Sequence, residues 1–127
     1  MNKINNLIDW ISAVVASEKV IIVEGSKDRK ALINIGIGNK IIMINGSDRG
    51  LFNVVEKAAK NKKIILLTDM DKKGKELYGK LRKDLCRLGV EVDNKFREWL
   101  QRNTKLSHIE GIDNYMMNDE NLKKNLF

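Results

Sequence analysis

The sequence predicts a doubly wound α/β domain with a mainly parallel sheet of about four strands and helices on both faces. Two observations predict it. Short, uniformly apolar and β-branched runs recur along the chain, as is typical of strands that are covered on both faces. Each run is followed by a longer segment whose apolar residues recur at helical spacing. Strands and helices that alternate in this way imply parallel pairing through right-handed crossovers.

The expected elements follow one another along the chain. Residues 2–18 place apolar side chains on one stripe and predict an amphipathic opening helix. The apolar runs predict strands at residues 19–23, 40–44, 62–67 and 90–92, and the segments after them predict helices at 26–36, 51–61, 72–89 and 96–103. After Thr104 the periodicity weakens. There we expect a short strand and a turn at 106–117, and the C-terminal segment 112–127 should end as either a closing helix or a basic tail.

We expect these elements to form one domain over residues 1–127, with a core at about 19–110. A chain of 127 residues is long enough to bury most of its apolar surface in a single core. Hydrophobic residues make up 43% of the chain and charged residues 32%, which is typical of folded rather than disordered proteins.

Charge, cysteine content and hydropathy limit the classes of function. Lys and Arg number 24 against 17 Asp and Glu, and the formal net charge of +7 favours polyanionic partners such as RNA or DNA. Cys86 is the one cysteine, so no disulfide or cysteine-based zinc site can form within this chain, and we expect a cytoplasmic location. No apolar stretch approaches the ~20 residues of a membrane span, so no membrane partner is expected.

Acidic residues follow two of the predicted strands, in VIIVEGSKD and IILLTDMDKKG. Glu24 ends the first strand, and Asp69 and Asp71 end the third. Ligands of open α/β sheets bind beyond the carboxyl ends of the strands, so these carboxylates converge if the two strands are neighbours. Carboxylates held close together repel one another unless a cation lies between them. We therefore expect Mg²⁺ at the carboxyl ends of these strands, with Mn²⁺ as the alternative.

The neighbouring residues fit a site of this kind. Gly25 and Gly74 lie where a tight turn or close backbone approach is useful. The third predicted helix after a strand begins with Lys72, Lys73 and Lys75. Lysines in the first turn of a helix are unfavourable to the helix dipole, but they can contact phosphate. The alternative is that the acids are ordinary helix N-caps. Either junction alone favours a cap, whereas the two together favour a metal site.

Four further residues are expected to have structural roles. His108 is the only histidine, and a lone histidine is more often structural than catalytic. Trp10 and Trp99 are expected to pack in the core or at an interface, and Cys86 is expected to be a small buried apolar group.

Taken together, VIIVEGSKD and IILLTDMDKKG resemble the motifs of the Toprim domain. This domain is shared by bacterial-type primases, topoisomerases, overcoming-lysogenization-type nucleases, recombination mediators and the ribonuclease that matures 5S ribosomal RNA. The resemblance covers about residues 19–110 and implies a Rossmann-like fold. The pattern is closest to the primase branch and to the 5S ribosomal RNA maturation branch. The segment HIEG, ending at Gly111, is similar to a segment near the end of the proteins of the second branch.

The resemblance also implies roles for single residues. Glu24 matches the family glutamate, which does acid or base work and sometimes contacts metal, and Asp69 and Asp71 match the paired metal-binding aspartates. Supporting positions are matched by Gly25, Asp28, Asn45, Gly46, Ser47 and Gly74, and Lys27, Lys72, Lys73 and Lys75 would neutralise phosphates. Topoisomerase-like members carry a third aspartate where this chain has Lys73, which argues against that branch and leaves the number of metals open.

Other metal and nucleotide folds fit these motifs less well. A receiver domain needs paired acids after its first strand, a haloacid-dehalogenase-type phosphatase carries DxD on its first strand, and GIGNK is not a P-loop. We therefore predict a Mg²⁺-dependent phosphodiester nuclease with RNA slightly favoured over DNA. The alternative is a non-catalytic Toprim module that binds RNA or DNA within a larger assembly. A homodimer and a ribonucleoprotein partner are both left open.

Overall fold

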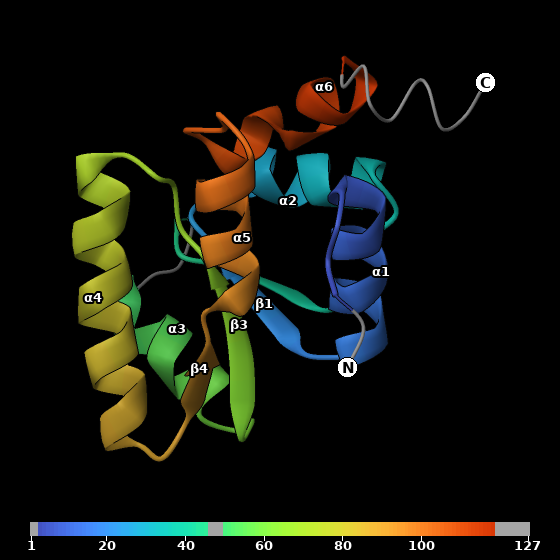
Figure 1. Cartoon of the computed structure of the whole chain (residues 1–127). Helices are drawn as coiled ribbons and strands as arrows, with labels where there is room; N and C mark the ends of the chain where they lie inside the picture. Colours follow the sequence, from blue (N-terminus) through green and yellow to red (C-terminus); the bar gives the residue numbers. More distant parts are fainter. Residues whose placement is uncertain (1–2, 46–49, 119–127) are drawn as a thin grey trace.

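The computed structural model describes residues 3–45 and 50–118. Its strands are β1 (Val20–Val23), β2 (Ile41–Met43), β3 (Lys63–Leu67) and β4 (Glu91–Asp93). Its helices are α1 (Leu7–Ser17), α2 (Ser26–Asn34), α3 (Leu51–Ala58), α4 (Lys72–Arg87), α5 (Lys95–Asn103), the short 3₁₀ helix η1 (Ile109–Gly111) and α6 (Ile112–Met117). All strands pair in parallel in the order β2-β1-β3-β4 (Figure 1), which confirms the predicted fold class.

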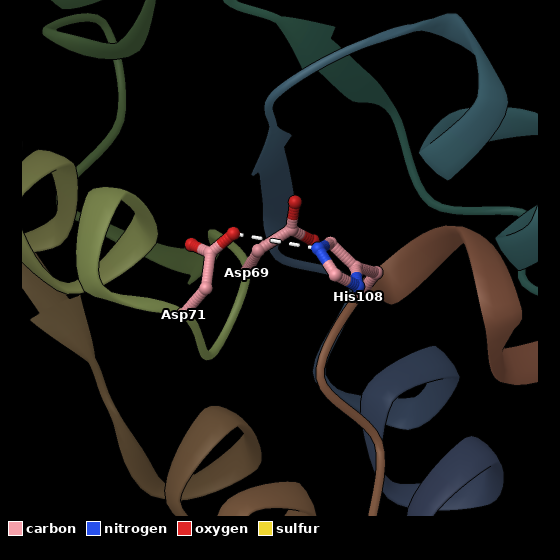
Figure 2. A group of neighbouring side chains, drawn as sticks. All are labelled: Asp69, Asp71 and His108. Atoms are coloured by element: carbon pink, nitrogen blue, oxygen red, sulfur yellow. Dashed lines mark ion pairs between the residues drawn. The ribbon is translucent and has the colours of Figure 1, made fainter.

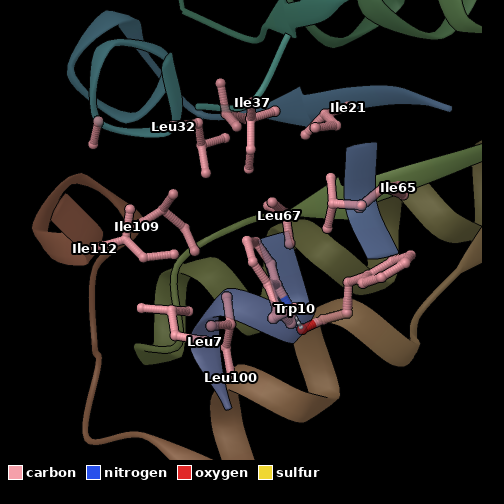
Figure 3. Close-up of a cluster of buried hydrophobic side chains, with 14 residues drawn as sticks. Leu7, Trp10, Ile21, Leu32, Ile37, Ile65, Leu67, Leu100, Ile109 and Ile112 are labelled. Atoms are coloured by element: carbon pink, nitrogen blue, oxygen red, sulfur yellow. Dashed lines mark hydrogen bonds between the residues drawn. The ribbon is translucent and has the colours of Figure 1, made fainter. Parts of the chain in front are cut away.

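Alternate residues of the central strands supply the two halves of the core. Ile21 and Ile65 pack in a cluster with α1, α2, α5 and η1, part of which Figure 3 shows. Ile22 and Ile64 point to the opposite face and pack in a second cluster with α3 and α4. Successive strand residues face opposite sides of a sheet, so a uniformly apolar strand requires helices on both faces.

Trp10 anchors α1 to the rest of the first cluster, as predicted from its helical position. It is fully buried, its indole N–H donates to the Phe96 carbonyl at 2.9 Å, and the two rings meet edge to face. The helix itself begins at Leu7 and not at residue 2. Asn6 caps it by accepting a hydrogen bond from the Asp9 amide at 2.8 Å, because a short amide side chain can satisfy a free N–H at a helix start.

Two expectations from the sequence were wrong. Residues 106–117 contain no strand and instead form a loop, η1 and α6. Ile109 and Ile112, three residues apart, are both fully buried against the first cluster, and a helical turn is the conformation that points both the same way. Cys86 is exposed, because it follows the buried Leu85 and lies about 100° further round the helix.

Candidate metal centre

The candidate site lies where β1 and β3 end side by side. These strands pair directly, with Val23 opposite Leu67, so the residues that follow them leave the sheet together. A Glu24 Oε2 atom accepts a hydrogen bond from the Asp69 amide at 2.7 Å. The adjacent strand order therefore brings the two acidic junctions of the sequence into contact.

Backbone amides hold one oxygen of each acidic side chain. The Asp69 Oδ1 atom accepts from the Ile109 amide at 2.8 Å, and Asp71 Oδ1 accepts from the Gly74 amide at 2.7 Å. Glu24 is held in the same way through Oε2. Each carboxylate thus has a second oxygen that takes no backbone hydrogen bond within the described residues. Oriented carboxylate oxygens are the donors that a hard divalent cation requires, so this donor set fits such an ion.

Asp71 serves as the cap of α4 and also lies in the site. Its side chain caps the helix through Gly74, which is the structural role that the cap alternative assigns to it. Its other oxygen, Oδ2, points to the side where Asp69 and His108 lie (Figure 2). Capping uses one oxygen and leaves the other, so the two roles are compatible.

His108 completes a three-residue cluster with the aspartates. One ligand atom each from Asp69, Asp71 and His108 lies within 4.8 Å of the other two, and His108 Nε2 lies 3.4 Å from Asp71 Oδ2 (Figure 2). As the only histidine of the chain, His108 was expected to have a structural role. Only its place in the HIEG segment pointed toward the site, since nothing in local spacing places residue 108 beside residues 69 and 71.

Glu24 lies beside this cluster and is not one of its three members. It lines a pocket of about 340 Å³ together with Asp69, Lys27 and Asn45. Burial raises the pKa of the Glu24 carboxyl above its ordinary value, and the negative charges of Asp69 and Asp28 raise it further. The hydrogen bond from the Asp69 amide opposes this change. Glu24 is therefore easier to protonate than a free glutamate.

The supporting residues fall into separate groups. Asp28 is buried and caps α2 by accepting from the Gly25 amide at 3.0 Å, while burial, Asp69 and Glu110 raise its pKa. The backbone N–H of Asn45 donates to the Glu24 carbonyl at 2.8 Å. Gly46 and Ser47 lie outside the described residues.

The four predicted phosphate-binding lysines are exposed at two helix starts. Lys27 stands in the first turn of α2 and lines the Glu24 pocket. Lys72, Lys73 and Lys75 stand in the first turns of α4, next to Asp71. The structure thus brings lysines to both sides of the acidic residues.

Arg97 of α5 is a residue that the sequence reasoning missed. Its buried guanidinium donates from Nε to the Thr68 carbonyl at 3.1 Å and from Nη2 to the Asp69 carbonyl at 2.8 Å. It also lies 4.7 Å from the centre of the Tyr78 ring. Burial lowers the pKa of Arg97, and nearby acids oppose this change. Arg97 therefore holds the loop that carries Asp69. The sequence gives no sign of this role, because a charged residue within an amphipathic helix belongs to no motif.

A family model of the Toprim domain matches residues 19–100, which include both acidic junctions. This chain belongs to the Toprim family. Toprim domains bind divalent metals and are associated with nucleic acids, and the cluster of Asp69, Asp71 and His108 is consistent with the first property. None of the described helices is long and apolar enough to cross a bilayer.

Similar proteins occur in archaea and in Aquifex. The chain is 38% identical over 96 residues to a UPF0292 protein of Thermococcus onnurineus, which covers 76% of this chain and 70% of the relative. It is 28% identical over 107 residues to a UPF0292 protein of Methanocaldococcus jannaschii, and the match covers 81% of this chain and 82% of the relative. A solved structure, a putative protein from Aquifex aeolicus, superposes with a TM-score of 0.75 at 34% identity, covering 84% of this chain and 98% of that one.

Proposed function

We propose that this Toprim protein is a divalent-metal-dependent phosphodiesterase that cleaves nucleic acid, with RNA preferred to DNA. The observation that supports it is the contact between the two acidic junctions. Glu24 accepts from the Asp69 amide, its pKa is raised, and it shares a pocket with Lys27 beside the aspartate pair. The preference for RNA rests on the likeness of HIEG to the ribosomal-RNA-processing branch.

Each group has a separate task in this proposal. Asp69 and Asp71 hold the cation, which when bound supplies positive charge at the scissile phosphate. Glu24 moves a proton to or from the reacting oxygen, because a raised pKa brings a carboxyl closer to neutral pH, where general acid and base catalysis is most effective. Lys27 neutralises a flanking phosphate from the rim of the pocket. Arg97 acts only through the loop carbonyls that it holds.

The first prediction is that Glu24→Gln abolishes cleavage and preserves the fold. An amide oxygen still accepts from the Asp69 amide, but it cannot carry the proton, so the rate should fall by about 10²–10⁴-fold. Glu56→Gln is the matched control, since Glu56 is an exposed glutamate on α3. Both variants and the wild type are assayed on labelled RNA and DNA, single- and double-stranded, with Mg²⁺ or Mn²⁺, and circular dichroism checks folding.

The same assay separates the enzyme from a non-catalytic module. Wild-type protein that binds RNA or DNA with salt-sensitive affinity, but cuts none of the substrates with either metal, would support a binding role and overturn the proposal. Equal cleavage by Glu24→Gln and the wild type would remove Glu24 from the mechanism.

A further inference from the structure

We infer that His108 is a nitrogen ligand of the cation held by Asp69 and Asp71, and that this site therefore prefers a first-row transition-metal ion such as Mn²⁺ to Mg²⁺. The inference rests on the metal-binding part of the proposed function and adds a ligand and a metal preference to it. The motif residues alone offer only carboxylate oxygens.

The spacing of the donor atoms suits a shared ion. Two ligands on adjacent corners of an octahedron, each ~2.1 Å from the cation, lie about 3.0 Å apart. His108 Nε2 and Asp71 Oδ2 are 3.4 Å apart, and Asp69 supplies an oxygen within 4.8 Å of both. These separations are close to those of donors that share one ion, and Figure 2 shows the three side chains next to one another.

The imidazole ring is oriented as in a metal-binding histidine. The Ser107 hydroxyl lies 2.9 Å from His108 Nδ1, on the side of the ring away from Asp71. When Nδ1 carries the proton and donates to Ser107, the lone pair of Nε2 faces the aspartates. Metal-binding histidines are held in this way, with the other ring nitrogen donating to a nearby acceptor.

The backbone on both sides of His108 is fixed to the aspartate loop. The Met70 amide donates to the Ser107 carbonyl at 2.8 Å, and the Ile109 amide donates to Asp69 Oδ1 at 2.8 Å. The histidine between these two bonds is therefore held across the loop that carries the aspartates. Its side chain is 51% exposed and that of Asp71 is 43% exposed, which leaves room for water and phosphate around the cation.

A nitrogen donor changes which metal the site favours. Mg²⁺ prefers oxygen ligands throughout. Imidazole suits Zn²⁺, Fe²⁺, Ni²⁺ and Cu²⁺ best, and Mn²⁺, the weakest binder of the first-row series, still accepts a nitrogen ligand more readily than Mg²⁺ does. Replacing one oxygen ligand by His108 should therefore strengthen Mn²⁺ binding relative to Mg²⁺. The rival explanation is that His108 only forms an ion pair with Asp71 and never contacts the metal.

Pulsed electron paramagnetic resonance of the Mn²⁺-loaded protein tests the inference directly. A coordinated imidazole produces a ¹⁴N coupling in the Mn²⁺ spectrum, and the signal is assignable because His108 is the only histidine of the chain. We expect the coupling in the wild type and its loss in His108→Ala. Wild-type protein that binds Mn²⁺ without a ¹⁴N coupling would support the ion pair and overturn the inference.

Calorimetric titration measures the metal preference without any cleavage assay. The wild type should bind Mn²⁺ more tightly than Mg²⁺. His108→Ala should lose about 10-fold or more in Mn²⁺ affinity and much less in Mg²⁺ affinity. An equal loss for both metals would contradict a nitrogen ligand.

A double variant separates this inference from the proposed function. Asp69→Asn with Asp71→Asn should abolish the binding of both metals, while His108→Ala keeps Mg²⁺ binding. Wild-type protein that binds neither metal would overturn both the metal site and the inference. Wild-type protein that binds both metals equally would overturn the inference alone.

Discussion

At the scale of single residues, Gly74 shows how closely the site is packed. A Cβ atom built on Gly74 would lie 2.6 Å from the carbonyl carbon of Asp69 and 2.9 Å from its Cα atom. The same glycine donates its amide to Asp71, and its carbonyl accepts from the Thr68 hydroxyl at 2.8 Å. The start of α4 can thus lie against the Asp69 backbone only where there is no side chain.

We predict that Gly74→Ala destabilises the protein by about 1–3 kcal/mol and weakens metal binding, because the Asp69 backbone must move. Gly79→Ala is the matched control on the same helix. Gly79 is exposed, and an added Cβ would meet no described atom within 4 Å apart from its chain neighbours and the backbone of its own helix, so alanine there should stabilise by about 0.4–1 kcal/mol. Chemical denaturation and Mn²⁺ titration measure the two effects. Equal stability of the two variants would contradict the packing argument.

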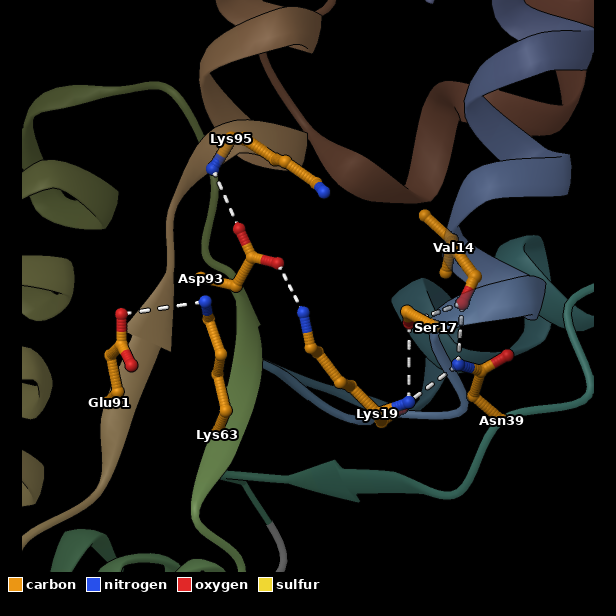
Figure 4. Close-up of polar contacts among 8 residues, drawn as sticks. All are labelled: Val14, Ser17, Lys19, Asn39, Lys63, Glu91, Asp93 and Lys95. Atoms are coloured by element: carbon orange, nitrogen blue, oxygen red, sulfur yellow. Dashed lines mark hydrogen bonds and ion pairs between the residues drawn. The ribbon is translucent and has the colours of Figure 1, made fainter. Parts of the chain in front are cut away.

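At the scale of elements, an ion pair joins the start of β1 to the end of β4. Lys19 Nζ lies 2.7 Å from Asp93 Oδ2, and the Lys95 amide donates to Asp93 Oδ1 at 3.3 Å (Figure 4). Asp93 is 7% exposed. Burial alone would raise its pKa, but the hydrogen bond and charge of Lys19, together with Lys95, outweigh burial and lower it.

This ion pair predicts an acid-sensitive part of the stability. The pKa of Asp93 is lower when folded than its ordinary value of 3.8, so its stabilising effect is present above that value and lost as the pH falls through the folded pKa. Asp93→Asn should therefore cost roughly 1–3 kcal/mol near neutral pH. That is less than the roughly 3–5 kcal/mol of a fully buried pair, because Lys19 remains 22% exposed.

Unfolding by urea at about pH 7 and about pH 2.5 measures this difference, which should shrink in acid. Asp84→Asn is the control, because Asp84 forms a surface pair with Arg87 at 3.9 Å and the loss of such a pair should cost less than about 1 kcal/mol. A cost of Asp93→Asn that stayed the same at both pH values would show that the lowered pKa does not contribute.

At the scale of the whole molecule, the net charge of +7 and the position of the lysines predict how binding depends on salt. Replacing Lys27, Lys72, Lys73 and Lys75 by glutamine should reduce the slope of log affinity against log salt by about 3 for single-stranded RNA, because each phosphate contact contributes about 0.7. The helix starts lose unfavourable charges in this variant, so the fold should persist.

The control removes the same amount of charge from the other end of the strands, where their amino ends lie. Exposed lysines near the amino ends of β2 and β3 are Lys40, Lys57, Lys60 and Lys62. Their replacement by glutamine should change the slope much less, and fluorescence anisotropy over a range of salt concentrations compares the two sets. Equal slopes of log affinity against log salt for both sets would mean that the net charge drives binding, and not the lysines beside the acidic residues.

Local sequence was sufficient for the strands and the acidic junctions. A strand buried on both faces must be apolar throughout, so Ile21–Val23 and Ile64–Leu67 could be recognised without any tertiary information. The ends of these strands followed for the same reason, since Glu24 and Thr68 interrupt the apolar runs. Beyond residue 104 the pattern was weak, and the prediction of a strand there was wrong.

The sequence by itself thus determined the α/β alternation, the family motifs and the positions of the acids, because these depend on residues close together along the chain. Only the tertiary structure decided which of them meet. The strand order places β1 beside β3 and so joins Glu24 to the Asp69 amide, and the packing of Ile109 on the first cluster brings His108 to Asp71. Contacts between distant segments depend on how elements pack, which no local pattern records.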